Sequence, residues 1–308
     1  MTVKAWLGGT AAVATAGLVY ANLETRWFEV KHVTVPILPP GEPDIRVLQL
    51  ADLHYLPSQD AKTRWLASLG ELKPDLVVDT GDNVSSRASI PALLEVLDSA
   101  GLLDVPGVFV GGSNDYFQPI LKNPALYLFK KHQIPLDLPP LPTEELFGGF
   151  EARGWVNLNN RRAVVKLGSG QVLDFVGTDD AHHDNDDFPA PLAASTEAKV
   201  SARIGVTHAP YLRVLQHFKD DGVALVIAGH THGGQLRIPG FGAIVTNCDL
   251  DRRRAEGLHG WPGSKPTSLL GADSIWLYVS AGAGTSPYAP FRFACRPSAT
   301  LLTLTAAH

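Results

Sequence analysis

The chain contains a series of short apolar runs, each followed by Asp, Asn or His and separated by longer segments. Five such runs lie at residues 46–50, 76–78, 107–110, 203–206 and 224–227. Runs of this length between helix-length stretches predict a mixed or parallel sheet with helical crossovers. In open α/β sheets, ligands bind outside the carboxyl ends of the strands, which is where these polar residues fall. We therefore expect the strand ends to converge on one functional site.

The polar groups at these ends are of the types that bind transition metals. In chain order they are Asp52 and His54, Asp82, Asn114 and Asp115, His208, and finally His230 and His232 within Gly229-His230-Thr231-His232-Gly233-Gly234. The glycines let the backbone approach a bound ion without a Cβ clash. Mixed imidazole and oxygen ligands suit Mn, Fe, Zn or Co better than Ca or Mg. The pattern predicts a polynuclear metal site.

The order of these motifs resembles that of the calcineurin-like metallophosphoesterase superfamily. Its signature is Asp-x-His, Gly-Asp, Gly-Asn-His-Asp/Glu, a lone His and then Gly-His-x-His. The sequence Gly-His-Thr-His-Gly-Gly-Gln at residues 229–235 is similar to that of a membrane-associated bacterial branch. The resemblance covers about residues 45–305. It implies an α/β fold with two packed mixed β-sheets flanked by helices, a four-layer αββα sandwich.

The resemblance also implies a ligand set for two divalent or mixed-valence metal ions, either Mn, Fe or Zn. One ion would be held by Asp52, His54, Asp82 and His232, and the other by Asp82, Asn114, His208 and His230. Asp82 would bridge the two ions, and Asn114, Asp115 and His208 would also act in catalysis. The implied reaction is hydrolysis of a phosphoester, in particular a phosphodiester, by in-line attack of a metal-bridging hydroxide.

The third motif departs from the family pattern, because residues 112–115 read Gly-Ser-Asn-Asp. Two registers are open. In one, Ser113 takes the ligand position and Asn114 replaces the histidine; in the other, Asn114 is the ligand and Asp115 takes the histidine position. We prefer the second register, because an amide oxygen is a better metal ligand than a neutral hydroxyl.

In either register, the histidine that commonly protonates the leaving group is missing. Asp115, His182 or His183 could replace it. The two histidines belong to a loop at residues 177–187 that also holds five Asp residues. That loop is either solvated or in contact with the substrate or an ion. The altered motif also leaves an alternative function, a catalytically weak metal-binding or scaffold protein of the same fold.

The chain begins with an apolar segment, here assigned to residues 1–22. Residues 5–21 carry no charge, and 17 helical residues span about 25 Å, slightly less than the roughly 30 Å hydrocarbon core of a bilayer. We favour a membrane anchor whose side of the membrane is open. A signal peptide cleaved after Ala21, which would give a secreted or cell-envelope protein, and a peripheral helix are the alternatives.

The remaining chain is expected to form a tether and one catalytic domain. Residues 23–44 would hold a Pro-rich tether and a first strand, and residues 45–308 the metallophosphoesterase domain. Further helices are expected near residues 60–72, 91–100, 124–132 and 211–218, and a second sheet from strands near 163–167, 172–176, 275–280 and 300–305. A tether of this kind favours phosphoester substrates met at the membrane, including lipid-linked ones.

Charge and cysteine content argue against a nucleic-acid-binding protein and against a structural role for the cysteines. A net charge of −5 gives no electrostatic basis for binding nucleic acid. The basic run Arg252-Arg253-Arg254 is either a solvated turn or a contact for phosphate or anionic headgroups. The only two cysteines, Cys248 and Cys295, lie outside any metal-spaced motif, and we do not expect them to pair.

Overall fold

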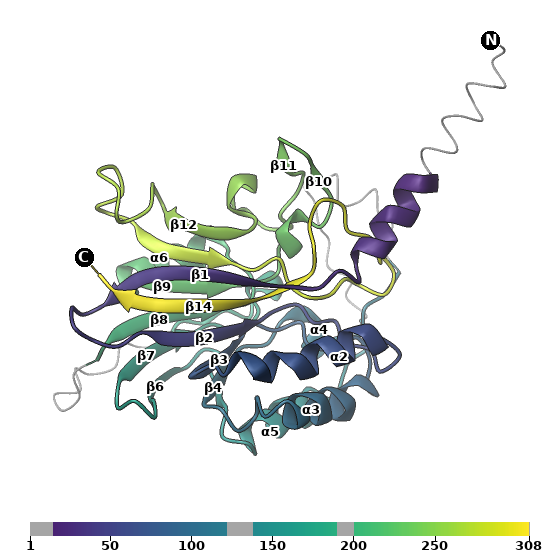
Figure 1. Cartoon of the computed structure of the whole chain (residues 1–308), viewed down its shortest axis with the longest axis horizontal. Helices are drawn as coiled ribbons and strands as arrows, with labels where there is room; N and C mark the ends of the chain where they lie inside the picture. The colour runs from purple at the N-terminus through teal and green to yellow at the C-terminus, as the bar shows by residue number, and fades with distance from the viewer. Residues whose placement is uncertain (1–14, 122–137, 190–199, 308) are drawn as a thin grey trace, which may run out of the picture.

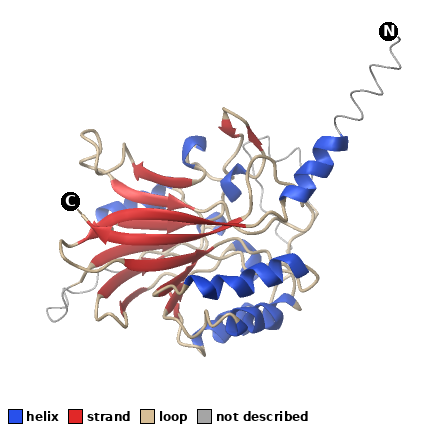
Figure 2. Cartoon of the chain, in the orientation of Figure 1, coloured by secondary structure: helices blue, strands red, loops and turns tan. Residues whose placement is uncertain are grey.

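Two six-stranded mixed sheets form the centre of the molecule (Figure 2). The computed structural model describes residues 15–121, 138–189 and 200–307. The first sheet has the order β1 (Glu29–Leu38), β14 (Ser298–Ala306), β2 (Ile45–Leu50), β3 (Leu76–Asp79), β4 (Gly107–Phe109) and β5 (Val156–Asn157). The second has the order β12 (Gly257–Trp261), β13 (Ile275–Val279), β9 (Leu225–Ala228), β8 (Ala202–Thr207), β7 (Val172–Gly177) and β6 (Arg162–Lys166).

Helices cover the outer face of each sheet (Figure 1). The helices are α2 (Asp60–Ser68), α3 (Ser89–Ser99), α4 (Ser113–Tyr116), α5 (Thr143–Glu151) and α6 (Leu212–Asp220), with short 3₁₀ helices η1 (Leu69–Leu72), η3 (Ala181–His183), η4 (His232–Gly234) and η5 (Arg252–Arg254). A small hairpin, β10 (Arg237–Ile238) and β11 (Gly242–Ala243), stands apart from both sheets. The expected α/β class with two mixed sheets flanked by helices is confirmed.

The alternation of side chains along each strand creates the layers. Val47 of β2 faces the second sheet, whereas Leu48 faces the helices on the outer side. On β9, Ile227 points to the first sheet and Val226 points to α6. Successive side chains of a strand point to opposite faces, so strands that are apolar throughout are buried on both sides. This burial explains why the sequence shows continuous apolar runs rather than alternation.

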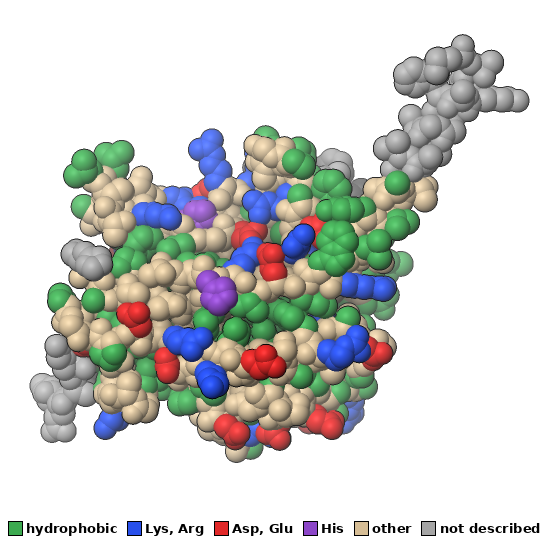
Figure 3. All heavy atoms as spheres, in the orientation of Figure 1, with side chains coloured by type: hydrophobic (Ala, Val, Ile, Leu, Met, Phe, Trp, Pro, Cys, Tyr) green, Lys and Arg blue, Asp and Glu red, His purple; other side chains and the backbone are tan. Residues whose placement is uncertain are grey.

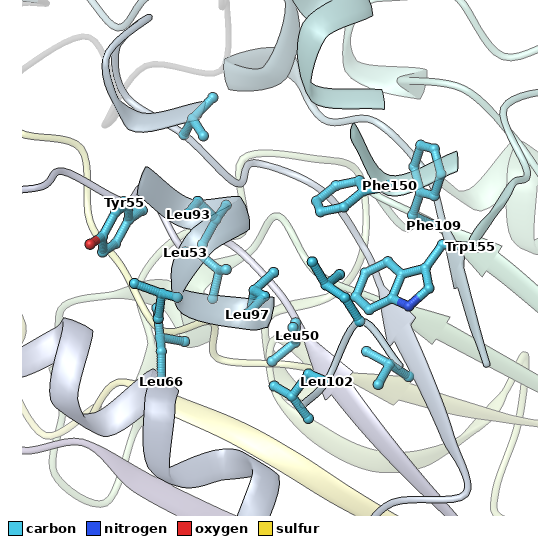
Figure 4. Close-up of a cluster of buried hydrophobic side chains, with 14 of the residues drawn as sticks. Leu50, Leu53, Tyr55, Leu66, Leu93, Leu97, Leu102, Phe109, Phe150 and Trp155 are labelled. Atoms are coloured by element: carbon cyan, nitrogen blue, oxygen red, sulfur yellow. The ribbon is translucent and has the colours of Figure 1, made fainter. Parts of the chain in front are cut away.

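The core beneath the outer helices is built from leucines and aromatic rings (Figure 4). Leu66 of α2 and Leu97 of α3 pack with Leu50 of β2 in this cluster. Phe150 of α5 stacks on Trp155, with ring centroids 5.0 Å apart. These contacts fix the helices against the sheet whose strand ends carry the polar motifs.

The elements expected from the sequence agree closely with the structure, with two differences. The expected helix near residues 124–132 lies outside the described residues. The strand near residues 300–305 belongs to the first sheet, not the second: β14 pairs with β1 and β2. Apolar residues on both faces of β14, such as Leu301 and Leu302, allow burial in either sheet, so the sequence alone did not identify the partner strands.

The segment expected to be a tether lies inside the fold. β1 pairs along its length with β14, and the proline-rich residues after Leu38 form the turn into β2. The chain is helical from residue 15 to residue 24, and residues 1–14 of the expected anchor lie outside the described residues. Within the described ranges, no helix is long and apolar enough to cross a membrane.

We expect the Leu97→Ala variant to lose about 2–5 kcal/mol in free energy of unfolding, because the fully buried side chain leaves a cavity between α3 and the sheet. Chemical denaturation of the variant and the parent chain measures this loss. Glu95→Ala, at an exposed position of the same helix, is the matched control and should change stability by less than about 0.5 kcal/mol. Equal losses in the two variants would contradict the packing described.

Candidate metal centre

The carboxyl ends of parallel strands in both sheets meet at one site. β2, β3 and β4 run parallel in the first sheet, and β8 and β9 run parallel in the second. Asp52 and Asp82 follow β2 and β3, while His208 directly follows β8 and His230 lies just beyond β9. The structure therefore brings together residues that are up to 180 positions apart in the sequence, as Asp52 and His232 show.

Four of these residues can hold a metal ion. Asp52, His54, Asp82 and His232 each offer a ligand atom, and these atoms lie within 4.8 Å of one another. The Nε2 atoms of His54 and His232 are 3.2 Å apart. His54 Nε2 also lies 3.5 Å from Asp82 Oδ2, and His232 Nε2 lies 3.6 Å from Asp52 Oδ1.

A second group of side chains lies on the other side of Asp82. His208 Nε2 is 3.6 Å from Asp82 Oδ1 and 3.3 Å from His230 Nδ1. The Asn114 side-chain amide donates a hydrogen bond to Asp82 Oδ2. The Asp82 carboxylate thus faces His54 with one oxygen and His208 with the other. All seven residues that the sequence singled out as metal ligands are within this one arrangement.

Hydrogen bonds to backbone carbonyls orient two of the imidazoles. Nδ1 of His208 lies 2.8 Å from the Thr80 carbonyl oxygen, and Nδ1 of His232 lies 3.1 Å from that of Gly284. Metal-binding histidines usually use one ring nitrogen in this way, which leaves the other available for the ion. Among the described residues, His54 Nδ1 is buried without a hydrogen-bond partner, and it is His54 Nε2 that faces the other ligand atoms. The donor set of two carboxylates and two imidazoles, with ligand atoms within 4.8 Å of one another, fits a site for a transition-metal ion.

The backbone at the site is held in a conformation that side chains other than glycine rarely adopt. Five of the seven predicted ligands have positive φ: Asp52 (48°), His54 (41°), Asp82 (57°), His230 (69°) and His232 (50°). Such residues are uncommon and cluster at functional sites, where the surrounding structure holds the strain. The left-handed turns direct several side chains from different loops into one small volume.

Neighbouring glycines leave the space that these side chains occupy. A Cβ on Gly112 would lie 2.5 Å from Asp82 Oδ1, and a Cβ on Gly282 would lie 2.6 Å from the Asp52 Cβ. A Cβ on Gly229 would lie 2.8 Å from Asp52 Oδ2. Glycine is therefore required on three sides of the two carboxylates.

Burial and neighbouring charges set the protonation of the site. Burial alone would lower the pKa of His208, but the carboxylates of Asp82, Asp52 and Asp180 raise it to about 9. Burial lowers the pKa of His54 to about 4. For Asp82, burial alone would raise the pKa, but His208, His54 and the hydrogen bonds from Asn114 hold it below its usual range. A buried Asp82 carboxylate facing a protonated His208 is the resulting state.

A cavity beside the candidate metal ligands is lined in part by the loop at residues 177–187. Ser113, Asn114, His182 and His183 line it together with the histidines of the cluster. Asp115 does not: it is fully buried, and its carboxylate accepts hydrogen bonds from the backbone N–H groups of Asp82, Asn83 and Gly112. Asp115 therefore holds the loop that carries Asp82.

Two buried side chains support the site without an individual role having been predicted for them; one of them, Asp180, lies in the loop at residues 177–187. Asp180 accepts a hydrogen bond from the Ser113 hydroxyl, and it follows β7 in the same strand-then-carboxylate pattern that identified the other residues. Arg292 is fully buried and donates to the carbonyl oxygens of Ala281, Gly282 and Gly284. The Gly284 carbonyl is the one facing His232. No local pattern marks Arg292 as part of the site.

Comparison with known proteins identifies the family. A family model described as calcineurin-like phosphoesterase matches residues 45–234, which include all seven predicted ligands. The chain belongs to this family. The metallophosphoesterase YkuE of Bacillus subtilis (strain 168) is 27% identical, covering 97% of this chain and 93% of its own. The phosphodiesterase YaeI of Escherichia coli (strain K12) is 28% identical and covers 98% of both chains. These relatives confirm the predicted family and its enzymatic class, a metallophosphoesterase.

A further relative comes from an animal. A protein of Danio rerio named "transmembrane protein with metallophosphoesterase domain" is 26% identical over 74% of this chain and 49% of its own length. The calcineurin-like domain is thus found in both bacterial and vertebrate relatives.

Gly112→Ala should weaken metal binding about 10- to 100-fold, because the new methyl group would displace the Asp82 carboxylate and the His208 ring. Titration of the metal-stripped protein with Zn²⁺ against a competing chelator measures the affinity. Gly148→Ala is the matched control, since a Cβ there meets no atom of the described residues within 4 Å. Unchanged affinity in Gly112→Ala would rule out the close packing described.

Metal affinity should rise with pH up to about 9. His208 carries a proton below its raised pKa, and a metal ion must displace that proton before it binds the imidazole. Between about pH 7 and 8.5, one released proton gives about a tenfold rise in affinity per pH unit. The same chelator competition measured across this range tests the expectation, and a flat profile would contradict a protonated His208.

Proposed function

We propose that this protein is a dinuclear metal-dependent phosphodiesterase. The position of Asp82 carries the proposal: its two carboxylate oxygens face histidines of two different groups, His54 on one side and His208 on the other. A carboxylate between two cations offsets their mutual repulsion. Asp82 is buried among hydrogen-bond donors, and this environment favours the negatively charged form of its carboxylate in the folded protein.

Each proposed ion has four ligands, with Asp82 shared. Asp52, His54, Asp82 and His232 would hold the first, in agreement with the cluster of ligand atoms there. Asp82, Asn114, His208 and His230 would hold the second. When bound, two such cations polarise the phosphoryl group and activate water as the nucleophile. The chain itself supplies the fixed imidazole directions and the left-handed turns that place the carboxylates.

Contacts in the third motif support Asn114 as the ligand. Its side chain reaches Asp82, whereas the hydroxyl of Ser113 donates to Asp180, 2.6 Å away. A serine used in that hydrogen bond has its proton directed away from the Asp82 group. The register with Asn114 in the ligand position is therefore the one we propose.

We assign the role of proton donor to His182 or His183 rather than to Asp115. Both histidines line the cavity, and His182 Nδ1 is 3.0 Å from the Tyr211 hydroxyl. Both carboxylate oxygens of Asp115 are occupied by backbone N–H groups. A general acid must reach the leaving-group oxygen, which the cavity position of the histidines allows.

We propose that the substrate is a phosphodiester met at a membrane or in the cell envelope, including lipid-linked ones. The relative YaeI is named a phosphodiesterase, and the vertebrate relative is named a transmembrane protein. The uncharged stretch at residues 5–21 supports an N-terminal anchor in this chain as well.

Hydrolysis of bis-p-nitrophenyl phosphate by the full chain, metal-stripped and then titrated with Mn²⁺, tests the proposal. The full chain is used because Glu24 accepts hydrogen bonds from the backbone of Ala294 and Cys295. We expect activity to saturate near two ions per chain and to fall by about 100-fold or more in Asp82→Ala. Asp44→Ala, an exposed carboxylate, is the control and should keep full activity.

Other outcomes identify the alternatives. Tight binding of two ions without turnover of any diester would indicate the metal-binding or scaffold protein. Activity that saturates at one ion and persists in Asp82→Ala would overturn the dinuclear assignment.

A further inference from the structure

The β10–β11 hairpin exposes two large apolar side chains at its tip. Ile238 is half exposed, and Phe241 is 61% exposed. The hairpin is fixed at its base, because the Arg237 N–H donates to the Phe293 carbonyl and the Arg237 guanidinium pairs with Glu256. The exposed apolar side chains therefore project from a hairpin whose base is fixed to the rest of the domain. We call Ile238 and Phe241 the hairpin tip.

The loop after β12 presents a second apolar pair, Leu269 and Leu270. Both side chains are almost completely exposed. Two successive turns hold them outward: the Ser268 N–H donates to the Lys265 carbonyl, and the Gly271 N–H donates to the Ser268 carbonyl. Scattered single leucines on a surface are normal, whereas adjacent exposed apolar side chains add to a contiguous patch, the kind of surface that meets a protein partner or a membrane. We call Leu269 and Leu270 the loop tip.

A groove of about 1420 Å³ lies between the two tips, and its lining is basic. Arg252, Arg253 and Lys265 line it, and within the described part of the chain none of the three forms an ion pair with a carboxylate. Arg252 lies over the ring of Phe241, 4.9 Å from its centroid. Asp251, the carboxylate in the lining, is paired with Arg254. In a chain of net charge −5, this groove is a local concentration of positive charge.

The N-terminal helix lies on the same side of the molecule as the two tips, the upper side in Figure 1. It exposes Leu18, Val19 and Leu23. The centroid of its Tyr20 ring lies 5.4 Å from that of the Phe293 ring. Phe293 in turn forms an isolated β-bridge with Leu236, the residue just before the hairpin. Apolar surface therefore continues from the helix to the hairpin. Figure 3 shows Lys and Arg side chains gathered between the apolar projections on this side.

We propose that the hairpin tip, the loop tip and the basic groove form a docking surface for an anionic lipid bilayer. The tips would enter the interface between headgroups and acyl chains, and the groove would bind the anionic headgroups. Two separate apolar projections with cations between them match a bilayer, in which anionic headgroups lie at the surface and apolar acyl chains lie beneath them. The surface uses none of the residues of the metal centre, so its test is independent of the phosphodiesterase proposal.

Environment-sensitive fluorophores on the full chain test this surface. The label is placed at Phe241→Cys or Leu269→Cys in a Cys248→Ser background, because Cys295 is buried. Ser169→Cys, in the exposed turn between β6 and β7 on the lower side in Figure 1, is the control position. With vesicles of phosphatidylcholine and phosphatidylglycerol, we expect a blue shift of emission at positions 241 and 269 and none at position 169.

The basic groove is tested by charge reversal. Arg252→Glu combined with Arg253→Glu should lower the apparent affinity of the labelled tips for these vesicles by about tenfold or more. Arg161→Glu combined with Lys166→Glu changes the net charge equally at exposed positions at the two ends of β6, outside the groove lining, and should leave the affinity unchanged. Sedimentation in the same samples reports how much of the chain is bound to vesicles.

Three results would overturn the proposal. One is a chain that sediments with vesicles while the labels at 241 and 269 show no shift, since the N-terminal segment alone would then make the contact. Another is an equal shift on vesicles of phosphatidylcholine alone. The third is the same shift with inorganic phosphate, which would make the groove a site for a soluble anion.

Discussion

The fold brings a buried carboxylate, Asp82, into contact with histidines from both sheets, and much of the surrounding structure serves to keep it there. A carboxylate without water is costly unless positive charge and hydrogen bonds surround it. Here His208 supplies the charge, Asn114 supplies hydrogen bonds, and Asp115 holds the backbone on which Asp82 sits. The centre thus depends on a polar network that reaches well beyond the candidate ligands.

The sequence was informative about strands and poor about their partners. Runs such as residues 76–78 and 203–206 are buried on both faces, so their apolar character predicted strands with nearly correct bounds. The same property concealed which sheet β14 joins. Sheet membership depends on contacts between segments more than 200 residues apart, as the pairing of β14 with β2 shows.

The candidate site was predictable because its residue types follow the strands, whereas its support was not. Asp52, His54 and His232 stand next to recognisable apolar runs and glycines. Arg292 acts through carbonyl groups of residues 281–284, and no spacing in the sequence relates it to His232. The positive φ values of the Asp and His ligands were equally hidden, since these residue types are enriched at positive φ but most of them adopt other conformations, and the surrounding fold selects which do so.

The contact between the N-terminal helix and the end of the chain has a consequence for how the protein could be processed. Ala21 is 5% exposed, and its carbonyl accepts a hydrogen bond from the N–H of Arg292. One turn later, the Glu24 carboxylate accepts a hydrogen bond from the backbone N–H of Cys295. A peptidase needs an extended, accessible bond, and the bond after Ala21 is helical and covered in the folded chain. Cleavage there would have to occur while the carboxyl-terminal residues are still unfolded, so the timing of synthesis and folding would decide whether this helix is retained.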